Sequence, residues 1–192
     1  MNKPFWRLSL FLAAWLAITP ATAFQSPWLG KGKTLAATGT VQLAFSPEDD
    51  ATGLIVRAIG EARQQILVQA FSFTSRDIAA ALLAAKRRGI DVRLIADREQ
   101  MEKTDRGKVR EMAAGGIPTL IDASHAAAHN KVMVIDARTP GATVVTGSFN
   151  FTYAAQTKNA ENVLILRGNL PLADAYRANW RHHRDHAFPY RP

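Results

Sequence analysis

Residues 129–162, HNKVMVIDARTPGATVVTGSFNFTYAAQTKNAEN, carry most of the fold and functional information in this chain. Two apolar runs within them, 131–136 and 142–146, predict short β-strands. The residues between the runs, 138–141, contain a Pro-Gly pair, which is a strong turn signal. A strand, a tight connection and a second strand are therefore expected here.

Chemically active side chains flank these two strands. Because side chains alternate along a strand, His129 and Lys131 are expected to point to the same side and to lie close together. After the second strand, Gly147 turns the chain, and Ser148 and Asn150 present a hydroxyl and an amide. An imidazole, an ammonium and neutral donors can attack, neutralise and bind a phosphodiester.

The pattern His129-x-Lys131-(x)4-Asp136, followed by Gly147-Ser148-x-Asn150, resembles the HKD signature of the phospholipase D superfamily. The continuation FNFTYAAQTKNAEN and the upstream segment VQAFSFTSRDIAAALLAAKRRGIDVRLIAD resemble the small, single-motif bacterial periplasmic endonucleases of the Nuc type. The resemblance covers residues 41–180. Ten residues separate Asp136 from Gly147, more than in the usual motif, and the extra ones fall at the Pro-Gly turn, where insertions are tolerated.

In this superfamily two histidines from two motif copies divide nucleophilic attack and proton transfer. The chain has one copy, so the resemblance implies a homodimer in which two copies of His129 meet across a two-fold axis. It implies that His129 forms a phosphohistidine in one subunit and acts as general acid and base in the other, with no cofactor and no metal. Asp136, also a signature residue, is expected at the strand end in a structural ion pair.

The resemblance also assigns the remaining site residues. Lys131 and Asn150 from both chains are expected to hold the phosphate oxygens, with Ser148 as a supporting donor. A neutral histidine nucleophile needs an acceptor for its other ring nitrogen. Glu161, in the sequence TKNAEN, occupies the position expected to supply that acceptor to His129.

The order of apolar runs predicts an α/β domain with a mixed or largely parallel central sheet flanked by helices on both sides. Ser46 is expected to cap the first helix, since Pro and two acids follow it. Leu172, Ala175, Tyr176 and Trp180 are expected to form the packing face of the last helix. The predicted strands are 41–45, 66–73, 90–96, 117–121, 131–136, 142–146 and 162–166, and the predicted helices are 47–64, 76–88, 106–114 and 171–187.

The first 23 residues have the features of a secretory signal peptide. Lys3 and Arg7 precede an apolar run at 8–18, and Ala21-Thr22-Ala23 provides a small-x-small cleavage site. Residues 24–40 are expected to be a loose leader before a single nuclease domain at 41–192. The cleaved protein would be periplasmic or secreted and would have no integral membrane association. An uncleaved anchor is the alternative.

The chain is basic and lacks cysteine. It has 24 Lys and Arg against 16 Asp and Glu, a net charge of +8, which favours polyanionic partners but also serves solubility alone. The absence of cysteine excludes disulfides and thiolate chemistry. The basic residues expected to lie around the site are Arg87, Arg88, Arg93, Arg98, Lys103, Arg106, Lys108 and Arg110.

Two further groups of residues are expected to have no catalytic role. His125 lies four residues before His129, and the sequence RHHRDH contains His182, His183 and His186. Helical histidine pairs can bind zinc, but these residues fall on a strand lead-in and a helix end, so no metal site is predicted. Phe71 and Phe73 are interpreted as core residues and not as base-stacking groups.

The predicted function is an exported, metal-independent phosphodiesterase that cleaves nucleic acid with little sequence specificity. One alternative is a phospholipase D that acts on a lipid headgroup by the same chemistry. Another is a nucleic-acid-binding accessory protein with an inactive site. The sequence does not distinguish DNA from RNA, or single from double strands.

Overall fold

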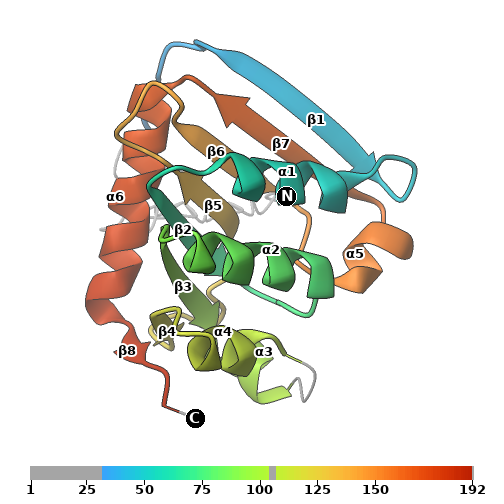
Figure 1. The fold of residues 1–192 in the computed structure, drawn as a ribbon, viewed down its shortest axis with the longest axis vertical. Coiled ribbons are helices and arrows are strands. Elements are labelled where there is room, and N and C mark those ends of the chain that lie inside the picture. The colour runs from blue at the N-terminus through green and yellow to red at the C-terminus, as the bar shows by residue number, and fades with distance from the viewer. Residues whose placement is uncertain (1–31, 104–106, 192) are drawn as a thin grey trace, which may run out of the picture. The chain divides into compact units, whose positions relative to one another are not determined.

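The central feature of the fold is a single twisted sheet (Figure 1). The computed structural model describes residues 32–103 and 107–191, so the predicted signal peptide and residues 24–31 of the predicted leader lie outside the described residues. Leu35–Pro192 form one compact unit. The strands are β1 Thr40–Ser46, β2 Gln65–Ala70, β3 Asp91–Asp97, β4 Thr119–Asp122, β5 Lys131–Ile135, β6 Thr143–Gly147, β7 Glu161–Arg167 and β8 Phe188–Pro189.

The strand order is β1-β7-β6-β5-β2-β3-β4-β8. Only the pairs β2–β3 and β3–β4 are parallel, and the other neighbours are antiparallel. The prediction of a mixed sheet is confirmed. Its parallel part is limited to three strands, because parallel neighbours need a long crossover, which helices provide here, whereas β5 and β6 are joined by a short turn.

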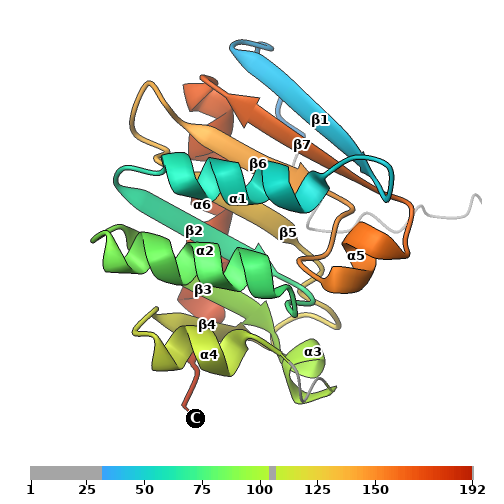
Figure 2. The same ribbon diagram turned by 45° about the vertical axis from the view of Figure 1, so that its right-hand side comes forward.

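Helices cover both faces of this sheet, as predicted. Figures 1 and 2 show α1, α2 and α4 on one face and α6 on the other. One apolar core lies between the sheet and the α1–α2 layer, and a second lies under α6. The helices are α1 Ala51–Glu61, α2 Arg76–Arg87, α3 Arg98–Lys103, α4 Val109–Ala114, α5 Tyr153–Thr157 and α6 Leu170–His186.

Trp180 anchors α6 to the sheet. Its side chain is 2% exposed, and its indole N–H donates to the carbonyl oxygen of Val68 at 3.0 Å. Leu172 and Tyr176 pack beside it against the second core, as predicted. Ala173, and not the expected Ala175, is fully buried in this face. Trp180 therefore holds the middle of α6 against the central strand β2.

Local capping decides where the helices begin. Ser75 accepts a hydrogen bond from the backbone N–H of Ile78 and caps α2, which begins at the predicted residue, Arg76. The predicted start of α1 at Ser46 is wrong, because β1 continues through Ser46, whose hydroxyl donates to the carbonyl of Ala155 at 2.6 Å. Asp50 caps α1 instead by accepting from the N–H of Gly53.

Several short elements were not predicted. Helices α3 and α5 and strand β8 span two to six residues, too few for a clear apolar period. Strand β2 ends at Ala70, three residues earlier than predicted, although the N–H of Phe71 still donates to the carbonyl of Asn130, the residue that precedes β5. Within the described ranges, no helix has the length and apolar character needed to cross a bilayer.

Candidate active site

Five of the six predicted site residues gather at one edge of the sheet. This edge contains the C-terminal ends of β2 and β6 and the N-terminal ends of β5 and β7, since Ala70 pairs with Lys131 and Gly147 pairs with Val163. Because β2–β5, β5–β6 and β6–β7 are antiparallel pairs, the ends of these strands meet at this edge although they are far apart in the sequence. The residues at this edge are His129, Lys131, Ser148, Asn150 and Glu161.

His129 and Lys131 are in direct contact, as the alternation predicts. The Lys131 ammonium lies 2.9 Å from Nδ1 and 3.1 Å from Nε2 of His129, and 2.9 Å from the His129 carbonyl oxygen. Lys131 is only 7% exposed, whereas His129 is exposed. A fixed cation therefore lies beside an accessible imidazole, which suits attack on an anionic substrate.

Phe71 forms one wall of this pair. Its ring centroid lies 4.2 Å from that of His129, and the Lys131 ammonium lies 4.7 Å from the Phe71 ring centroid. The interpretation of Phe71 as a core residue is wrong, because the side chain is half-buried against the site. Phe73 is a core residue, 4% exposed, and packs edge-on against Phe151.

The electrostatic state of Lys131 depends on burial. Desolvation lowers the pKa of Lys131 below its ordinary value, because burial penalises the charged ammonium. The carboxylate of Glu161 acts in the opposite direction and raises the Lys131 pKa. Glu161 is thus close enough to Lys131 to influence its charge, although the two residues begin different strands.

Ser148 and Glu161 form a hydrogen-bonded pair across β6 and β7. The Ser148 hydroxyl donates to Oε2 of Glu161 at 2.6 Å and accepts from the backbone N–H of Asn162 at 3.0 Å. Gly147 permits this approach, because its φ is 149° and a Cβ there would collide with the Asn162 carbonyl oxygen. The hydroxyl proton of Ser148 is committed to Glu161, so Ser148 positions that carboxylate.

No hydrogen bond joins Glu161 to His129 of the same chain, two residues that the structure describes. The other oxygen of Glu161, Oε1, accepts from the side-chain amide of Asn159 at 3.0 Å. Among residues 32–103 and 107–191, the ring nitrogens of His129 are hydrogen-bonded only to Lys131. The expected acceptor for His129 is therefore absent within this described part of one subunit. Asn150 is at the edge, and its Oδ1 is buried without a hydrogen-bond partner among the same residues.

Asp136 lies at the opposite end of β5 from Lys131. Its Oδ2 accepts from the N–H of Arg63 at 2.8 Å, and its Oδ1 accepts from the N–H groups of Gln64 and Gln65 at 2.8 and 2.9 Å. Asp136 is 6% exposed. The expectation of a structural role agrees with this position, but the expected ion pair is replaced by three backbone hydrogen bonds that hold the connection between α1 and β2.

The predicted basic surface does not form one patch around the site. Arg93, Lys103 and Lys108 pair with acids close in sequence. Arg87 ends α2 just before the start of β3. The start of β3 lies at the edge of the sheet opposite the one that carries His129. Arg106 lies outside the described residues. A cavity of about 1250 Å³ opens between α1, α2 and α5, and neither His129 nor Lys131 lines it.

Three of the remaining histidines converge away from His129. His125, His183 and His186 surround the carboxylate of Asp122. The interpretation of His183 as a solvated helix-end residue is wrong, since its side chain is 11% exposed. Asp122 was missed because its partners His183 and His186 are 61 and 64 residues away in sequence. The available signal was the spacing D-x2-H and H-x2-H.

Comparison with known proteins agrees with this geometry. The family described as "Cardiolipin synthase, PLD-like domain" matches residues 55–184. A Rickettsia bellii protein named phospholipase D is 39% identical over 140 residues, which cover 73% of this chain and 67% of that protein. The structure of Nuc, a phospholipase D family member from Salmonella typhimurium, is 38% identical with a TM-score of 0.74 and covers 81% of this chain and 100% of its own.

NucT from Helicobacter pylori has a TM-score of 0.72 at 21% identity over 80% of this chain and 100% of its own, and it supports the fold alone. The matched region 55–184 includes each of the six predicted site residues. The histidine and lysine of the signature contact one another at the sheet edge. The chain belongs to the phospholipase D superfamily and is a phosphodiester hydrolase.

Proposed function

We propose that the protein is an exported endonuclease that cleaves nucleic acid with little sequence specificity, through a phosphohistidine and without a catalytic metal. The observation that carries this proposal is the exposed His129 ring held 2.9 Å from the buried Lys131 ammonium. The cation neutralises the non-bridging phosphate oxygens, which otherwise repel a nucleophile. The neutral imidazole then attacks phosphorus.

The reaction needs a second histidine. Departure of the alkoxide requires a proton donor, and hydrolysis of the phosphohistidine requires a base to activate water. His129 of the partner subunit supplies both: it gives its proton to the leaving oxygen and then accepts one from the attacking water. A homodimer with a two-fold axis at the site brings the two copies together.

The contacts of one subunit support a shared site. His129 lacks an acceptor in the described part of its own chain, and Glu161 at the same edge bonds only Ser148 and Asn159 there. We place Glu161 of the partner subunit against His129, where it fixes the ring. The Oδ1 of Asn150 is buried and has no hydrogen-bond donor among the described residues. A second chain or a substrate can supply that donor.

An apolar strip on β1 provides a surface for this dimer. Val41, Leu43 and Phe45 alternate on one side of the edge strand and are 59%, 53% and 55% exposed. They lie on the same face of the sheet as α6, but α6 contacts β2, β4, β5 and β6. Phe45 pairs with Asn162, beside Ser148. We propose that a second copy of the chain covers this strip, since it continues into the site.

Nucleic acid is the favoured substrate for two reasons. Without residues 1–23, which include Lys3 and Arg7 and no acid, the chain keeps 22 of its 24 Lys and Arg against 16 Asp and Glu, a net charge of +6, which favours a polyanion, and such cations bind phosphates without reading bases. The alignment with Nuc, at 38% identity, covers the whole length of Nuc, and the motif of this chain resembles that of the Nuc-type endonucleases. Export is proposed from the signal-peptide features of residues 1–23, and N-terminal sequencing of the mature protein tests it, since Phe24 is the expected first residue.

A lipid headgroup is the second candidate substrate. It is favoured by the Rickettsia relatives named phospholipase D, at 39% identity. The chemistry at His129 is the same for both substrates, because each presents a phosphodiester. The two candidates differ in the products that the enzyme releases.

Nicking of supercoiled plasmid in excess EDTA tests the proposal, with phosphatidylcholine and cardiolipin vesicles as parallel substrates. Wild type is expected to nick the plasmid, and His129→Ala is expected to be inactive. His182→Ala, which changes an exposed histidine outside the site, is the matched control and should retain activity. Hydrolysis of the vesicles without nicking would favour a lipid headgroup as the substrate. Activity retained by His129→Ala would contradict the proposed chemistry.

A further inference from the structure

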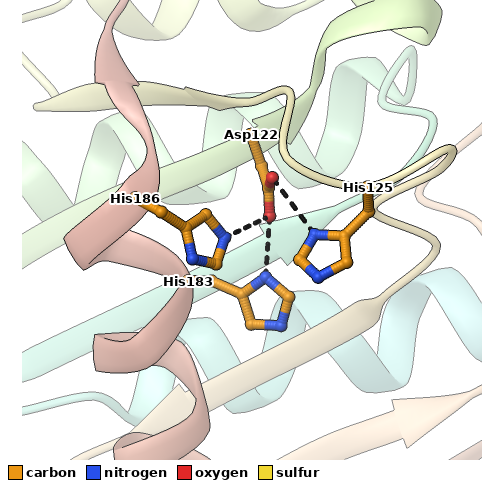
Figure 3. A group of neighbouring side chains, drawn as sticks. All are labelled: Asp122, His125, His183 and His186. Carbon is orange, nitrogen blue, oxygen red and sulfur yellow. Dashed lines mark hydrogen bonds and ion pairs between the residues drawn. The ribbon is translucent and has the colours of Figure 1, made fainter.

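A second cluster of chemically active side chains lies where the C-terminal turns of α6 meet the end of β4. Figure 3 shows His125, His183 and His186 directed at the carboxylate of Asp122. Asp122 ends β4, and His125 lies in the loop that follows. His183 and His186 are three residues apart, so they share one face of α6. The end of β4 with its following loop and the C-terminal turns of α6 are far apart in the sequence, and they meet here through four possible metal ligands.

The geometry of the cluster approaches that of a tetrahedral zinc site. The carboxylate lies 2.7 Å from Nδ1 of His183, 3.2 Å from Nε2 of His186 and 3.4 Å from Nδ1 of His125. Zinc–nitrogen bonds of about 2.0 Å place neighbouring tetrahedral ligands about 3.3 Å apart. All four ligand atoms lie within 4.8 Å of one another, so small side-chain rotations close the set around one ion.

The chemistry of the set also favours a cation. Asp122 is 1% exposed, and a buried carboxylate is stable only when it is paired or coordinates a metal. Three imidazoles and one carboxylate are ligands that zinc accepts. Ligating carboxylates are themselves held by hydrogen bonds, and the N–H of Ser124 donates to Oδ1 of Asp122 at 3.0 Å.

We propose that Asp122, His125, His183 and His186 bind one Zn²⁺ per chain and that this ion has a structural role. The ligand His125 lies four residues before His129. The same loop is fixed further along by the N–H of Ala128, which donates to the buried carboxylate of Asp97 at 2.8 Å. The ion joins this loop to α6 and so fixes the segment that carries the nucleophile.

The site is separate from the proposed catalytic chemistry. His129 does not belong to the ligand set, and its ring contacts Phe71 and Lys131 instead. His182 lies beside the cluster, with its ring centroid 5.3 Å from that of His186, and is not a member of the set either. Its substitution therefore provides a matched control on the same helix.

Metal content and affinity of the full chain, purified without a polyhistidine tag, test the inference. After removal of metal and addition of Zn²⁺, elemental analysis should find one zinc per chain, and the melting temperature should rise. His183→Ala and His186→Ala should weaken zinc binding by at least about 100-fold in a competition titration, because each removes a direct ligand. His182→Ala and His129→Ala should bind zinc as wild type does.

His125→Ala provides a variant whose folding is not at risk, because this residue is exposed in a loop. It should also weaken zinc binding, with an unchanged circular dichroism spectrum. Zinc that binds only at millimolar concentration, or that binds His125→Ala and His186→Ala as tightly as wild type, would overturn the inference. So would a melting temperature that zinc does not raise. Each of these readouts is independent of catalytic activity.

Discussion

Replacement of Asp136 by alanine is expected to destabilise the protein without a direct effect on the chemistry. The carboxylate accepts three backbone hydrogen bonds, from Arg63, Gln64 and Gln65. Hydrogen bonds to a charged group contribute about 1.5–3 kcal/mol each and do not add fully, since one carboxylate makes all three. Asp136 also has a φ of 50°, where alanine costs about 1 kcal/mol.

Together these terms predict a loss of about 4 kcal/mol for Asp136→Ala. Asp136→Asn is the matched control. Its amide oxygen can still accept from Gln64 and Gln65, which share Oδ1, and asparagine tolerates the left-handed conformation. Its loss should be about 1–2 kcal/mol, because one hydrogen bond and the charge are removed.

Urea unfolding at one fixed protein concentration measures both variants, since the stability of the proposed dimer would depend on concentration. In a chain of this size, the alanine variant should melt about 10 °C below wild type. Activity per folded protein should be retained at low temperature. An alanine variant as stable as wild type, or a stable one without activity, would refute the structural assignment of Asp136.

Three further predictions concern charge, assembly and packing. Burial lowers the pKa of Lys131, so the alkaline fall in kcat/KM should occur at a lower pH than an ordinary lysine would give. Glu161→Gln should move this fall to still lower pH, because it removes the carboxylate that raises the Lys131 pKa. A shift to higher pH would contradict this. Leu43→Asp should convert the dimer to monomers in analytical ultracentrifugation and abolish nicking, whereas a dimer that persists would exclude the β1 strip as the interface. Trp180→Phe should destabilise the chain by about 2 kcal/mol, because it loses the hydrogen bond to Val68 and leaves a small cavity; an unchanged urea midpoint would contradict this.

The sequence predicted the main strands and helices because their apolar runs are long and clearly bounded. The end of β2 was misjudged, since the run ILVQAFSF stays apolar beyond the last ladder residue, Ala70. That error concealed Phe71, whose ring lies against His129. The apolar pattern contains no sign of this end, and the N–H of Phe71 still donates to the carbonyl of Asn130, the residue that precedes β5.

The site was predictable to the extent that it is local in sequence. Alternation alone places His129 beside Lys131, and the structure confirms their contact. The pairing of Ser148 with Glu161 depends on the register of β6 against β7. The Asp122–His183 contact spans 61 residues. Such contacts follow from tertiary packing, which periodicity within one element does not encode.

The shared active site is the central claim, and subunit mixing tests it most directly. Wild type is exchanged with an equal amount of His129→Ala, native mass spectrometry verifies the exchange, and plasmid nicking is measured. If each site needs both copies of His129, only wild-type dimers are active, and the activity should fall to about half that of the same wild type unmixed. Mixing with His182→Ala should cause no loss. Full activity after verified exchange with His129→Ala would contradict the account.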